Sequence, residues 1–375
     1  MYFSSETIEY LKKTDLTKRK KLGQYFTNKI IREDLISHLP KIPNADILEP
    51  SAGTGEFIET IIKSFDNPNI DATEIDQELC NIVKNKFNKI NVVCADALSL
   101  SYKKYDYIIG NPPYFKIDAK LVDKNEYGKI INGRINIFGL FIKHHIDLLK
   151  DGGYLAFVVP CVINNGLYFD KLRKYIINNT NIEYIKTFDE HNFEDALQKV
   201  MIIILKKTSN KGNYIFKNIF SPEFEWLEKQ FVNKKTLKEL GFKAKTGSVV
   251  WNQNKDLLSN NPADTLLIWA HNLKEKNFSS QKKPQYIKTM KNIINKKSVV
   301  VNRIIGSGDN IKINAMIIDP PFLGENHTNI IQGDESQYGK IVEVLTSMET
   351  KEILKNIIGS TQLSKKELEN FIPIG

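Results

Sequence analysis

The chain is poor in cysteine and has no long apolar segment. Its 375 residues include three cysteines, and their spacing matches neither a disulfide framework nor a zinc site. The six histidines form no His-Glu-x-x-His motif, so a metal catalyst has no support. The longest apolar run, 200–205, has the length of a strand, and the first residues do not resemble a secretory signal. We therefore expect a protein of a reducing cytoplasm, without metal, membrane segment or disulfide.

Neither sign of charge is in excess over the first 205 residues, which contain 27 Lys+Arg and 27 Asp+Glu. Residues 206–375 contain 26 Lys+Arg and 17 Asp+Glu, so they carry the entire net charge of +9. A surplus confined to one part of a chain is typical of a surface that binds a polyanion, but a lysine-rich, solvated surface would give the same count. The charge therefore favours a nucleic-acid partner only together with a second observation.

Strand-like and helix-like segments alternate over the first two hundred residues. The pattern predicts strands at 46–49, 70–74, 91–96, 105–110, 154–159, 182–188 and 200–205. Apolar residues with helical spacing predict helices among them, at 57–65, 79–87 and 140–149. Such alternation is typical of an α/β fold, a parallel sheet with helices on both faces, and the last two strands suggest a closing antiparallel pair.

The alternation ends near residue 206, which suggests a boundary between two domains. We assign 1–207 to the first domain and 208–375 to a smaller, mixed α+β domain. In the second, 299–305 and 311–318 flank a glycine-containing turn and predict a hairpin. Ser364 is followed three residues later by Glu367, a capping box that predicts a final helix.

A glycine-rich turn joins the first predicted strand to the first predicted helix. Gly53 and Gly55 allow the backbone to turn sharply and to approach a ligand closely. Ile58 stands where a dinucleotide-binding loop has a third small residue, and the Gly-Lys-Ser/Thr of a P-loop is missing. Glu49, at the mouth of the turn, would repel a phosphate but suits a ligand with a cationic sulfonium or ammonium group. The turn therefore predicts a site for a nucleoside without phosphates.

Two further acids end the next predicted strands, at the edge of the sheet where ligands bind in α/β folds. Glu74 follows Gly55 by nineteen residues, and its carboxylate can accept hydrogen bonds from both ribose hydroxyls. Asp96 can accept a hydrogen bond from the amino group of an adenine. Acids at three successive strand ends favour this interpretation over ordinary loop residues.

The fourth predicted strand continues into Asn111-Pro112-Pro113-Tyr114. The prolines fix the backbone and remove two N–H donors, which leaves carbonyl groups free to accept. The Asn111 side-chain oxygen and the Pro112 carbonyl can receive both hydrogens of an amino group, and they stabilise the positive charge that develops when its nitrogen attacks a methyl group. Tyr114 offers a flat face on which a base can stack. Alone, the tetrapeptide is moderately specific and indicates methylation of an amino or amide nitrogen.

Further segments follow in a fixed order around these motifs: 21–27 (Lys-Leu-Gly-Gln-Tyr-Phe-Thr) before the glycine turn, then 74–76, Asp96, the tetrapeptide, 134–141, 151–160 and Asn192-Phe193. In this order, over roughly 20–207, the chain resembles the gamma group of DNA adenine amino-methyltransferases of bacterial restriction–modification systems. The resemblance implies a class I (Rossmann-like) methyltransferase fold with a seven-stranded sheet. It also implies S-adenosyl-L-methionine as cofactor and adenine in double-stranded DNA as substrate.

The resemblance also assigns roles to residues. It implies that the cofactor is bound by Tyr25, Thr27, Glu49, Pro50, Ser51, Gly53, Gly55, Glu74, Ile75, Asp96, Ala97, Asn111 and Phe141. The catalytic set would be Asn111, Pro112, Pro113, Tyr114 and Phe193, with the target base stacked between Tyr114 and Phe193. Because a base inside a duplex cannot reach such a place, the adenine must be flipped out.

In this group the region after the last catalytic motif reads the DNA sequence, and here that region holds all of the net positive charge. Candidate DNA-binding residues are Lys243, Lys245, Trp251, Lys282, Lys283 and Arg303. A second tetrapeptide, Asp319-Pro320-Pro321-Phe322, has the form of a variant catalytic motif. No glycine turn with acids at later strand ends accompanies it, so we interpret it as a loop of the recognition domain.

Other functions remain open at this point. A methyltransferase acting on a glutamine of a translation release factor, or on an RNA amino group, would use similar chemistry, and a non-catalytic nucleic-acid-binding protein is a third alternative. The segment 21–27 and the basic second domain favour DNA. The resemblance allows for a cognate restriction endonuclease that acts separately, and for a place on the nucleoid of a bacterium.

Overall fold

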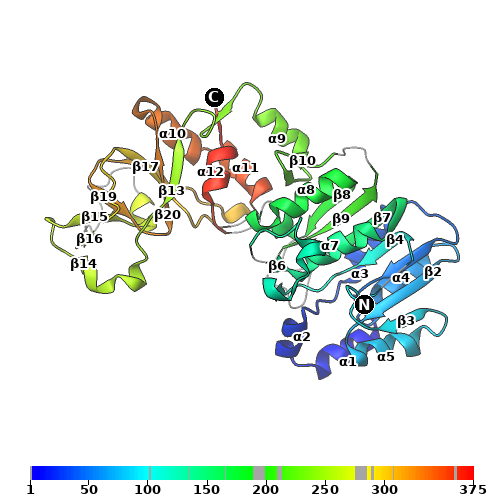
Figure 1. Cartoon of the computed structure of the whole chain (residues 1–375). Coiled ribbons are helices and arrows are strands. Elements are labelled where there is room, and N and C mark those ends of the chain that lie inside the picture. Colours follow the sequence, from blue (N-terminus) through cyan, green and yellow to red (C-terminus); the bar gives the residue numbers. More distant parts are fainter. Residues whose placement is uncertain are drawn as a thin grey trace. The chain divides into compact units, whose positions relative to one another are not determined.

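The computed structural model describes residues 2–100, 103–133, 135–164, 166–188, 199–208, 213–274, 285–288, 291–306, 308–358 and 361–375. The chain forms two compact units, Met1–Phe224 and Glu225–Gly375, which Figure 1 shows in sequence colours. The first unit therefore extends beyond the boundary expected after residue 207. The strands β10 (Ile215–Phe216) and β11 (Ile219–Phe220) belong to it, because Phe220 is fully buried in its apolar core.

A seven-stranded sheet forms the centre of the first unit, in the order β3-β2-β1-β4-β7-β9-β8. The five strands at one side run parallel, whereas β9 is antiparallel to both β7 and β8. Their bounds are β1 Asp46–Glu49, β2 Asn69–Glu74, β3 Asn91–Cys94, β4 Tyr105–Gly110, β7 Leu149–Pro160, β8 Thr180–Phe188 and β9 Val200–Lys207. A parallel sheet with this strand order and one antiparallel strand is the class I methyltransferase fold.

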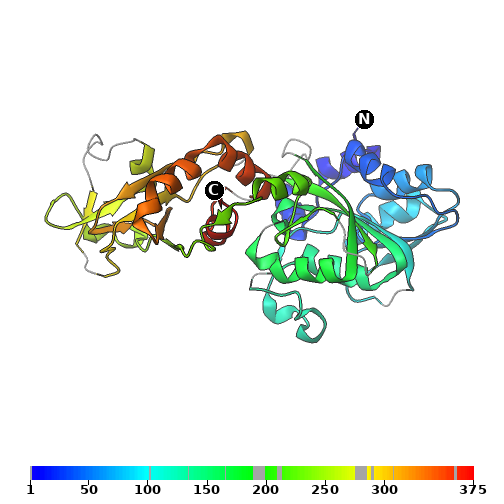
Figure 2. The same ribbon diagram turned by 90° about the horizontal axis from the view of Figure 1, so that it is seen from above.

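Helices cover both faces of this sheet (Figure 2). Right-handed crossovers lead from β1 through β2 to β3 in one direction and from β4 to β7 in the other, so their helices lie on opposite faces. The helices are α3 Lys29–Ser37, α4 Glu56–Ser64 and α5 Gln77–Lys86, then α7 Ile137–Asp147 and α8 Asp170–Asn179. The central strands contain long buried apolar runs, such as 155–159 in β7 and 200–205 in β9, because both of their faces are covered.

Shorter elements complete the first unit. Two further helices precede α3, namely α1 Ser5–Lys13 and α2 Leu16–Leu22, and each begins at a side-chain cap, Ser4 and Asp15 respectively. Between β4 and α7 lie β5 Lys116–Ile117, α6 Lys124–Tyr127 and β6 Ile135–Asn136.

The predicted elements of the first unit are confirmed with small shifts at their ends. The strands at 46–49 and 105–110 match the expected residues, and the closing antiparallel pair is present. The largest difference is β7, which begins at Leu149 rather than at 154. Its Lys150–Gly153 segment is polar, but Leu149 pairs with Tyr105, so the backbone enters the sheet early.

The second unit contains two four-stranded sheets, ordered β13-β20-β17-β18 and β14-β16-β15-β19. The first consists of β13 Lys243–Thr246, β17 Ser298–Asn302, β18 Ala315–Ile318 and β20 Thr328–Gln332. The second consists of β14 Leu258–Ser259, β15 Thr265–Ile268, β16 Gln285–Ile287 and β19 Phe322–Gly324. An apolar cluster that includes Val300, Phe322 and Ile330 joins residues of both sheets.

Helices and a terminal strand close the second unit: α9 Phe224–Gln230 at its start, α10 Tyr338–Thr346, α11 Met348–Ile357 and α12 Lys365–Asn370. The last strand, β21 Pro373–Ile374, pairs with β12 Lys235–Thr236. The predicted hairpin is confirmed as the antiparallel pair β17–β18, and the predicted capping box is confirmed at the start of α12.

The expectation of unpaired cysteines is wrong for two of the three. Cys80 in α5 and Cys94 at the end of β3 form a disulfide, with their Cα atoms 5.7 Å apart. Fourteen residues separate them, and only the packing of α5 against β3 brings them together. Cys161 is buried and is not part of this disulfide. Among the described residues, no helix is both long and apolar enough to cross a membrane.

Candidate active site

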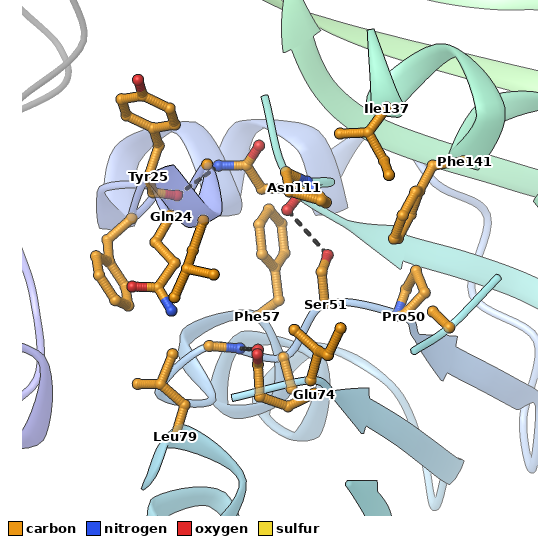
Figure 3. A pocket seen from close by; sticks show the side chains of 18 of the residues that line it. Gln24, Tyr25, Pro50, Ser51, Phe57, Glu74, Leu79, Asn111, Ile137 and Phe141 are labelled. Atoms are coloured by element: carbon orange, nitrogen blue, oxygen red, sulfur yellow. Dashed lines mark hydrogen bonds between the residues drawn. The ribbon is translucent and has the colours of Figure 1, made fainter. Parts of the chain in front are cut away.

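A cavity of about 300 Å³ opens at the carboxyl ends of the parallel strands, where α/β folds bind ligands (Figure 3). Twelve of the sequence-predicted site residues line it: Tyr25, Thr27, Pro50, Ser51, Gly53, Glu74, Ile75, Asp96, Ala97, Asn111, Pro113 and Phe141. They come from the segment before α3, the glycine turn, the ends of β2, β3 and β4, and α7. The structure therefore brings together residues that are spread over more than one hundred positions.

The glycine turn lies under one side of this cavity. Gly53 has a φ of +56° and donates its N–H to Glu74 Oε2 at 2.8 Å. Gly55, also predicted as a cofactor-binding residue, has a φ of +86° and is not among the residues that line the cavity. A Cβ atom there would lie 2.4 Å from the Phe87 ring, so this glycine serves the turn and its packing.

Glu74 holds the turn and still faces the cavity. Its second carboxylate oxygen accepts from the Asp76 N–H at 2.9 Å, and burial raises the pKa of this carboxyl. Beside it, Ile75 is 65% exposed, an unusual position for a large apolar side chain unless a ligand covers it. Asp96 lies two residues beyond the end of β3, exposed at the cavity wall next to the buried Ala97.

Glu49 is the clearest departure from its predicted position. It does not lie at the mouth of the turn but beneath it, 1% exposed, where Oε1 accepts from the Ser51 N–H at 3.0 Å. Its Oε2 is buried and accepts no hydrogen bond from the described residues. Burial raises the pKa of Glu49 to about 8, so the group is largely neutral at pH 7 rather than a fixed negative charge. Gly110 makes room for it, since a Cβ there would lie 2.3 Å from Glu49 Oε1.

Asn111 stands at the rim of the cavity with a defined amide orientation. Its Nδ2 donates to the Tyr25 carbonyl at 2.8 Å and to Thr27 Oγ1 at 3.0 Å. A backbone carbonyl can only accept, so the amide nitrogen must face Tyr25 and the amide oxygen must face away. The Asn111 backbone carbonyl accepts from Ser51 Oγ at 2.9 Å, a contact drawn in Figure 3. Both ends of this residue are therefore held by neighbouring segments.

Tyr114 does not present the open face that its sequence position suggested. It is buried, and its ring stacks on Tyr25 with centroids 5.4 Å apart. Its hydroxyl contacts both Asn111 Oδ1 and the carbonyl of Val158, at 2.8 Å from the latter. Burial raises the pKa of this phenol well above its usual value, so the group keeps its single proton and can donate to only one of the two acceptors at a time.

Three predicted catalytic residues remain, namely Pro112, Pro113 and Phe193. Pro112 is buried and is not part of the cavity lining, whereas Pro113 is. Phe193 lies outside the described residues.

Other lining residues were not predicted as site residues, among them Gln24, Phe26, Phe57, Leu79 and Ile137. Gln24 and Phe26 belong to the segment 21–27, so the resemblance of that segment could have indicated them. Phe57, Leu79 and Ile137 sit on helices, where an apolar residue is ordinarily assigned to the core.

In the second unit, the predicted DNA-binding residues are spread over separate elements. Lys243 and Lys245 are exposed on β13, whereas Lys282 and Lys283 lie outside the described residues. Arg303 is half-buried and donates to the Asn326 carbonyl at 3.3 Å. Trp251 is 38% exposed. Val249, two residues before it, accepts at its carbonyl from the N–H of Asn326 at 2.8 Å, so this segment and Arg303 contact the same turn, which contains Asn326.

That turn, Glu325 to His327, was missed by sequence reasoning. Glu325 is 1% exposed, and its Oε1 lies 2.9 Å from the half-exposed His327 Nδ1. A polar turn between two short strands carries no sequence signal that distinguishes it from an ordinary hairpin. Its backbone contacts Arg303 and Val249, and Val249 lies two residues before Trp251.

The described residues around the second tetrapeptide, Asp319 to Phe322, form no arrangement comparable to the one around Asn111. Asp319 is exposed and pairs with Lys297 Nζ at 3.0 Å, and Phe322 is fully buried in the apolar cluster of β15, β17 and β20. In the described part of the chain, no three His, Cys, Asp or Glu side chains gather as ligands for a metal ion.

Known proteins resemble the chain in both sequence and fold. The family described as Eco57I restriction-modification methylase matches residues 10–193. Modification methylase CviBIII of Paramecium bursaria Chlorella virus NC1A is 26% identical over 98% of both chains. Type II methyltransferase M.HincII of Haemophilus influenzae is 34% identical, over 55% of this chain and 41% of its own.

Among solved structures, that of the DrdV–DNA complex covers 87% of this chain and 50% of its own, with a TM-score of 0.52 and 14% identity, which is a likeness of fold. Together with the seven-stranded sheet and its cavity, the family match and the full-length relative lead to one assignment. The chain belongs to the DNA methyltransferases of restriction–modification systems.

Proposed function

We propose that this DNA methyltransferase transfers a methyl group from S-adenosyl-L-methionine to the exocyclic 6-amino group of a flipped-out adenine in double-stranded DNA. The observation that carries the proposal is the orientation of Asn111. Its amide nitrogen is bound to Tyr25 and Thr27, so its amide oxygen is directed as an acceptor beside the cavity. An acceptor held in this way suits a substrate nitrogen that carries hydrogens and gains positive charge.

The cavity suits the proposed cofactor at both of its ends. The exposed Ile75 offers an apolar face to an adenine ring, Asp96 can accept from its amino group, and Glu74 can accept from ribose hydroxyls. At the other end, Thr27 and Ser51 offer hydroxyl groups, and the free Oε2 of Glu49 lies beneath Ser51. A cationic ligand would favour the ionised form of this carboxyl, which otherwise is protonated at neutral pH.

The chemistry divides between cofactor and protein. The bound cofactor would supply an electrophilic methyl group on a positively charged sulfur. The protein supplies acceptors, the Asn111 amide oxygen and the Pro112 carbonyl, for the two hydrogens of the attacking amino group. These acceptors stabilise the charge on the nitrogen as it loses conjugation with its ring.

Tyr114 can free one of these acceptors. Its O–H group can donate to the Val158 carbonyl, 2.8 Å away, instead of to Asn111 Oδ1. Asn111 Oδ1 can then accept from a substrate amino group. The proton then stays hydrogen-bonded in either state, so no buried donor is left without a partner.

The stacking face of Tyr114 is covered by the Tyr25 ring. We therefore propose that the incoming base displaces Tyr25 from Tyr114. Stacking contributes about 1–3 kcal/mol per base, against the few kcal/mol that flipping costs. The second unit, with Lys243, Lys245 and Arg303, would hold the duplex, and a separate restriction endonuclease would share the recognition sequence.

The test is methyl transfer from labelled cofactor to double-stranded DNA, RNA and protein substrates, followed by identification of the modified nucleoside or amino acid. The expected product is N6-methyladenine in duplex DNA. Label on cytosine, on RNA or on a glutamine side chain would contradict the proposal.

A further inference from the structure

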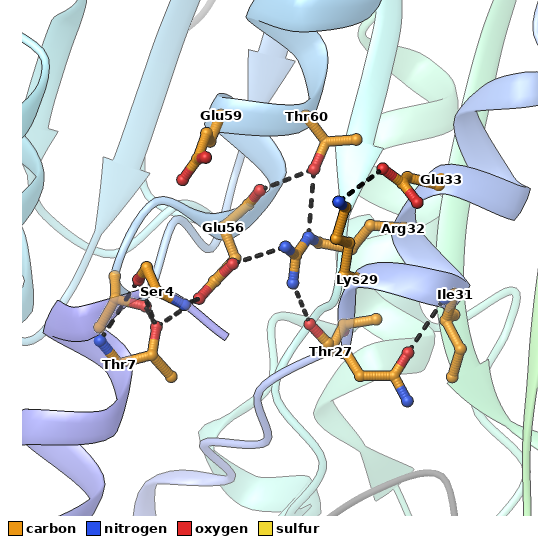
Figure 4. A network of polar contacts seen from close by, with 12 residues as sticks. Ser4, Thr7, Thr27, Lys29, Ile31, Arg32, Glu33, Glu56, Glu59 and Thr60 are labelled. Atoms are coloured by element: carbon orange, nitrogen blue, oxygen red, sulfur yellow. Dashed lines mark hydrogen bonds and ion pairs between the residues drawn. The ribbon is translucent and has the colours of Figure 1, made fainter. Parts of the chain in front are cut away.

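A buried ion pair lies behind the segment that holds Asn111. Arg32 in α3 and Glu56 in α4 are about 5% exposed, and their Nη2 and Oε2 atoms are 2.6 Å apart (Figure 4). Desolvation lowers the pKa of Arg32, and the carboxylate of Glu56 opposes that shift. A buried pair of this kind is weak evidence for stability, because desolvation offsets much of the attraction. Its presence is better explained by what the two side chains hold in place.

Arg32 uses its remaining donors on two further partners. Nε donates to Thr60 Oγ1 at 3.1 Å, and Nη1 donates to the carbonyl of Thr27 at 2.5 Å. Because the guanidinium is planar and rigid, these bonds and the ion pair to Glu56 fix one position for the Thr27 carbonyl. A lysine could pair with Glu56 but could not reproduce all three directions.

Thr27 contacts both Arg32 and Asn111, so it connects the restraint on its carbonyl with the Asn111 amide. Its carbonyl faces Arg32, while its Oγ1 accepts from Asn111 Nδ2 at 3.0 Å. Thr27 is itself buried, so no water can readily take over either contact. The direction of the Asn111 amide is thus linked to Arg32 through one residue.

Glu56 is anchored in turn to the N-terminal residues. Its Oε1 accepts from the Ser4 N–H at 2.7 Å and from Thr7 Oγ1 at 2.6 Å. The Thr7 hydroxyl also lies 2.6 Å from Thr54 Oγ1, in the glycine turn. The network therefore connects the start of α1 to three segments that line the cavity: the residues before α3, the glycine turn and α4.

We propose that Arg32 is a positioning residue for methyl transfer, which sets the amide of Asn111 through the Thr27 carbonyl, with Glu56 holding the guanidinium. This inference rests on the proposed function, because it assigns to Asn111 the reception of the substrate amino group. It predicts that the network affects the rate of the chemical step more than cofactor affinity.

The first experiment compares Arg32→Lys with Arg173→Lys in the full-length protein. Arg173 is an equally buried arginine of the same unit, and it donates to the carbonyls of Asn218, Ile163 and Gly166 at 2.7–3.0 Å. None of these partners lines the cavity. The measurements are the single-turnover methylation rate, the cofactor dissociation constant and the melting temperature.

We expect Arg32→Lys to lower the single-turnover rate by about 10- to 100-fold, since small misplacements of a catalytic group have effects of that size. Its cofactor dissociation constant should change by less than about threefold. Arg173→Lys should lower the melting temperature with the rate kept at a temperature where the protein is folded. The inference would be overturned if Arg32→Lys behaved like Arg173→Lys, with a lower melting temperature and an unchanged methylation rate.

A second pair of variants keeps the test valid if Arg32→Lys does not fold. Thr27→Val removes the hydroxyl that accepts from Asn111, and Thr27→Ser keeps it. We expect Thr27→Ser to be at least about tenfold faster than Thr27→Val, and equal rates would contradict the link. If the wild-type protein methylates no adenine, the proposed function fails; if it does and these variants show no rate effect, only the positioning role fails.

Discussion

Two tetrapeptides of nearly the same composition, Asn111 to Tyr114 and Asp319 to Phe322, occupy very different surroundings. Each follows a strand and continues through two prolines to an aromatic residue. The first borders a cavity of about 300 Å³, and its polar residue is bound through both its amide and its backbone. The second begins with an exposed acid paired to Lys297 and ends in a fully buried phenylalanine.

The difference shows that the tetrapeptide owes its chemistry to neighbouring segments. Asn111 is oriented by Tyr25 and Thr27, and these belong to a part of the chain some eighty-five residues earlier. Among the described residues, Asp319 has no comparable restraint, and its ion pair is with the half-exposed Lys297. Substitutions at the two places should therefore have opposite consequences for rate and stability.

The largest effect is expected at Asn111. Asn111→Ala removes the oriented acceptor and should lower the methylation rate by about 10²–10³-fold, the usual cost of losing one group that stabilises charge in a transition state. Cofactor binding should remain, because most of the cavity lining is unchanged. Asp319→Ala is the matched control and should leave the rate as it is. Near-normal activity of Asn111→Ala in a single-turnover assay would refute the assigned role.

The aromatic residues give the second comparison. Tyr114→Ala removes a stacking face and should slow methylation by about 10- to 100-fold, in line with 1–3 kcal/mol of stacking. Tyr114→Phe keeps the ring and should lose only a few-fold. Phe322→Ala should instead lower the free energy of unfolding by about 3–5 kcal/mol, measured by denaturant titration, because it empties a packed core position. A rate loss in folded Phe322→Ala protein as large as that of Tyr114→Ala would remove the distinction.

The sequence predicted the first unit better than the second for a physical reason. Alternating strands and helices have strong periodicities, so β1, β4 and the strand-end acids were found at or near their observed places. Side-chain direction and depth are set by packing, which a linear pattern does not contain. Hence Glu49 was expected at the mouth of the turn but lies beneath it, and Tyr114 was expected open but stacks on Tyr25.

The disulfide and the turn at 325–327 were missed for the same reason. Cys80 and Cys94 meet only because α5 packs on β3, and Glu325 is buried where the chain passes from β19 of one sheet to β20 of the other. Neither the contact between the two cysteines nor the burial of Glu325 follows from the spacing of residues along the chain. The second unit consists largely of such short strands, so its predicted DNA contacts remained individual residues rather than a site.

A smaller effect is expected from the lysines of β13, in the unit that contains the second tetrapeptide. Lys243→Ala together with Lys245→Ala should weaken DNA binding similarly for all sequences and reduce the slope of log affinity against log salt by about two. Lys84→Ala with Lys89→Ala, exposed lysines of the first unit, is the control. An unchanged slope in the β13 double variant, measured by fluorescence anisotropy, would show that this strand does not contact phosphates.

The smallest effect concerns the acid beneath the first tetrapeptide, which again contrasts with the exposed Asp319. Burial raises the pKa of Glu49 to about 8, so the folded protein without ligand keeps a proton that the unfolded chain releases near the ordinary value of 4.5. The contribution of Glu49 to stability is therefore present at low pH and is lost as pH rises toward about 8. Burial raises the pKa of Glu74 as well, so the comparison must be made against a Glu49 variant.

Binding of a cationic cofactor should reverse this preference, because a positive charge nearby favours the ionised carboxyl. Cofactor affinity should then rise by up to about tenfold between pH 7 and about pH 8, with release of a proton, and level off above it. Titration calorimetry in buffers of different ionisation enthalpy measures that proton directly. In Glu49→Gln the proton release should disappear and the pH profile should flatten; the same release in both proteins would mean that Glu49 does not sense the cofactor's charge, and that its burial serves the glycine turn alone.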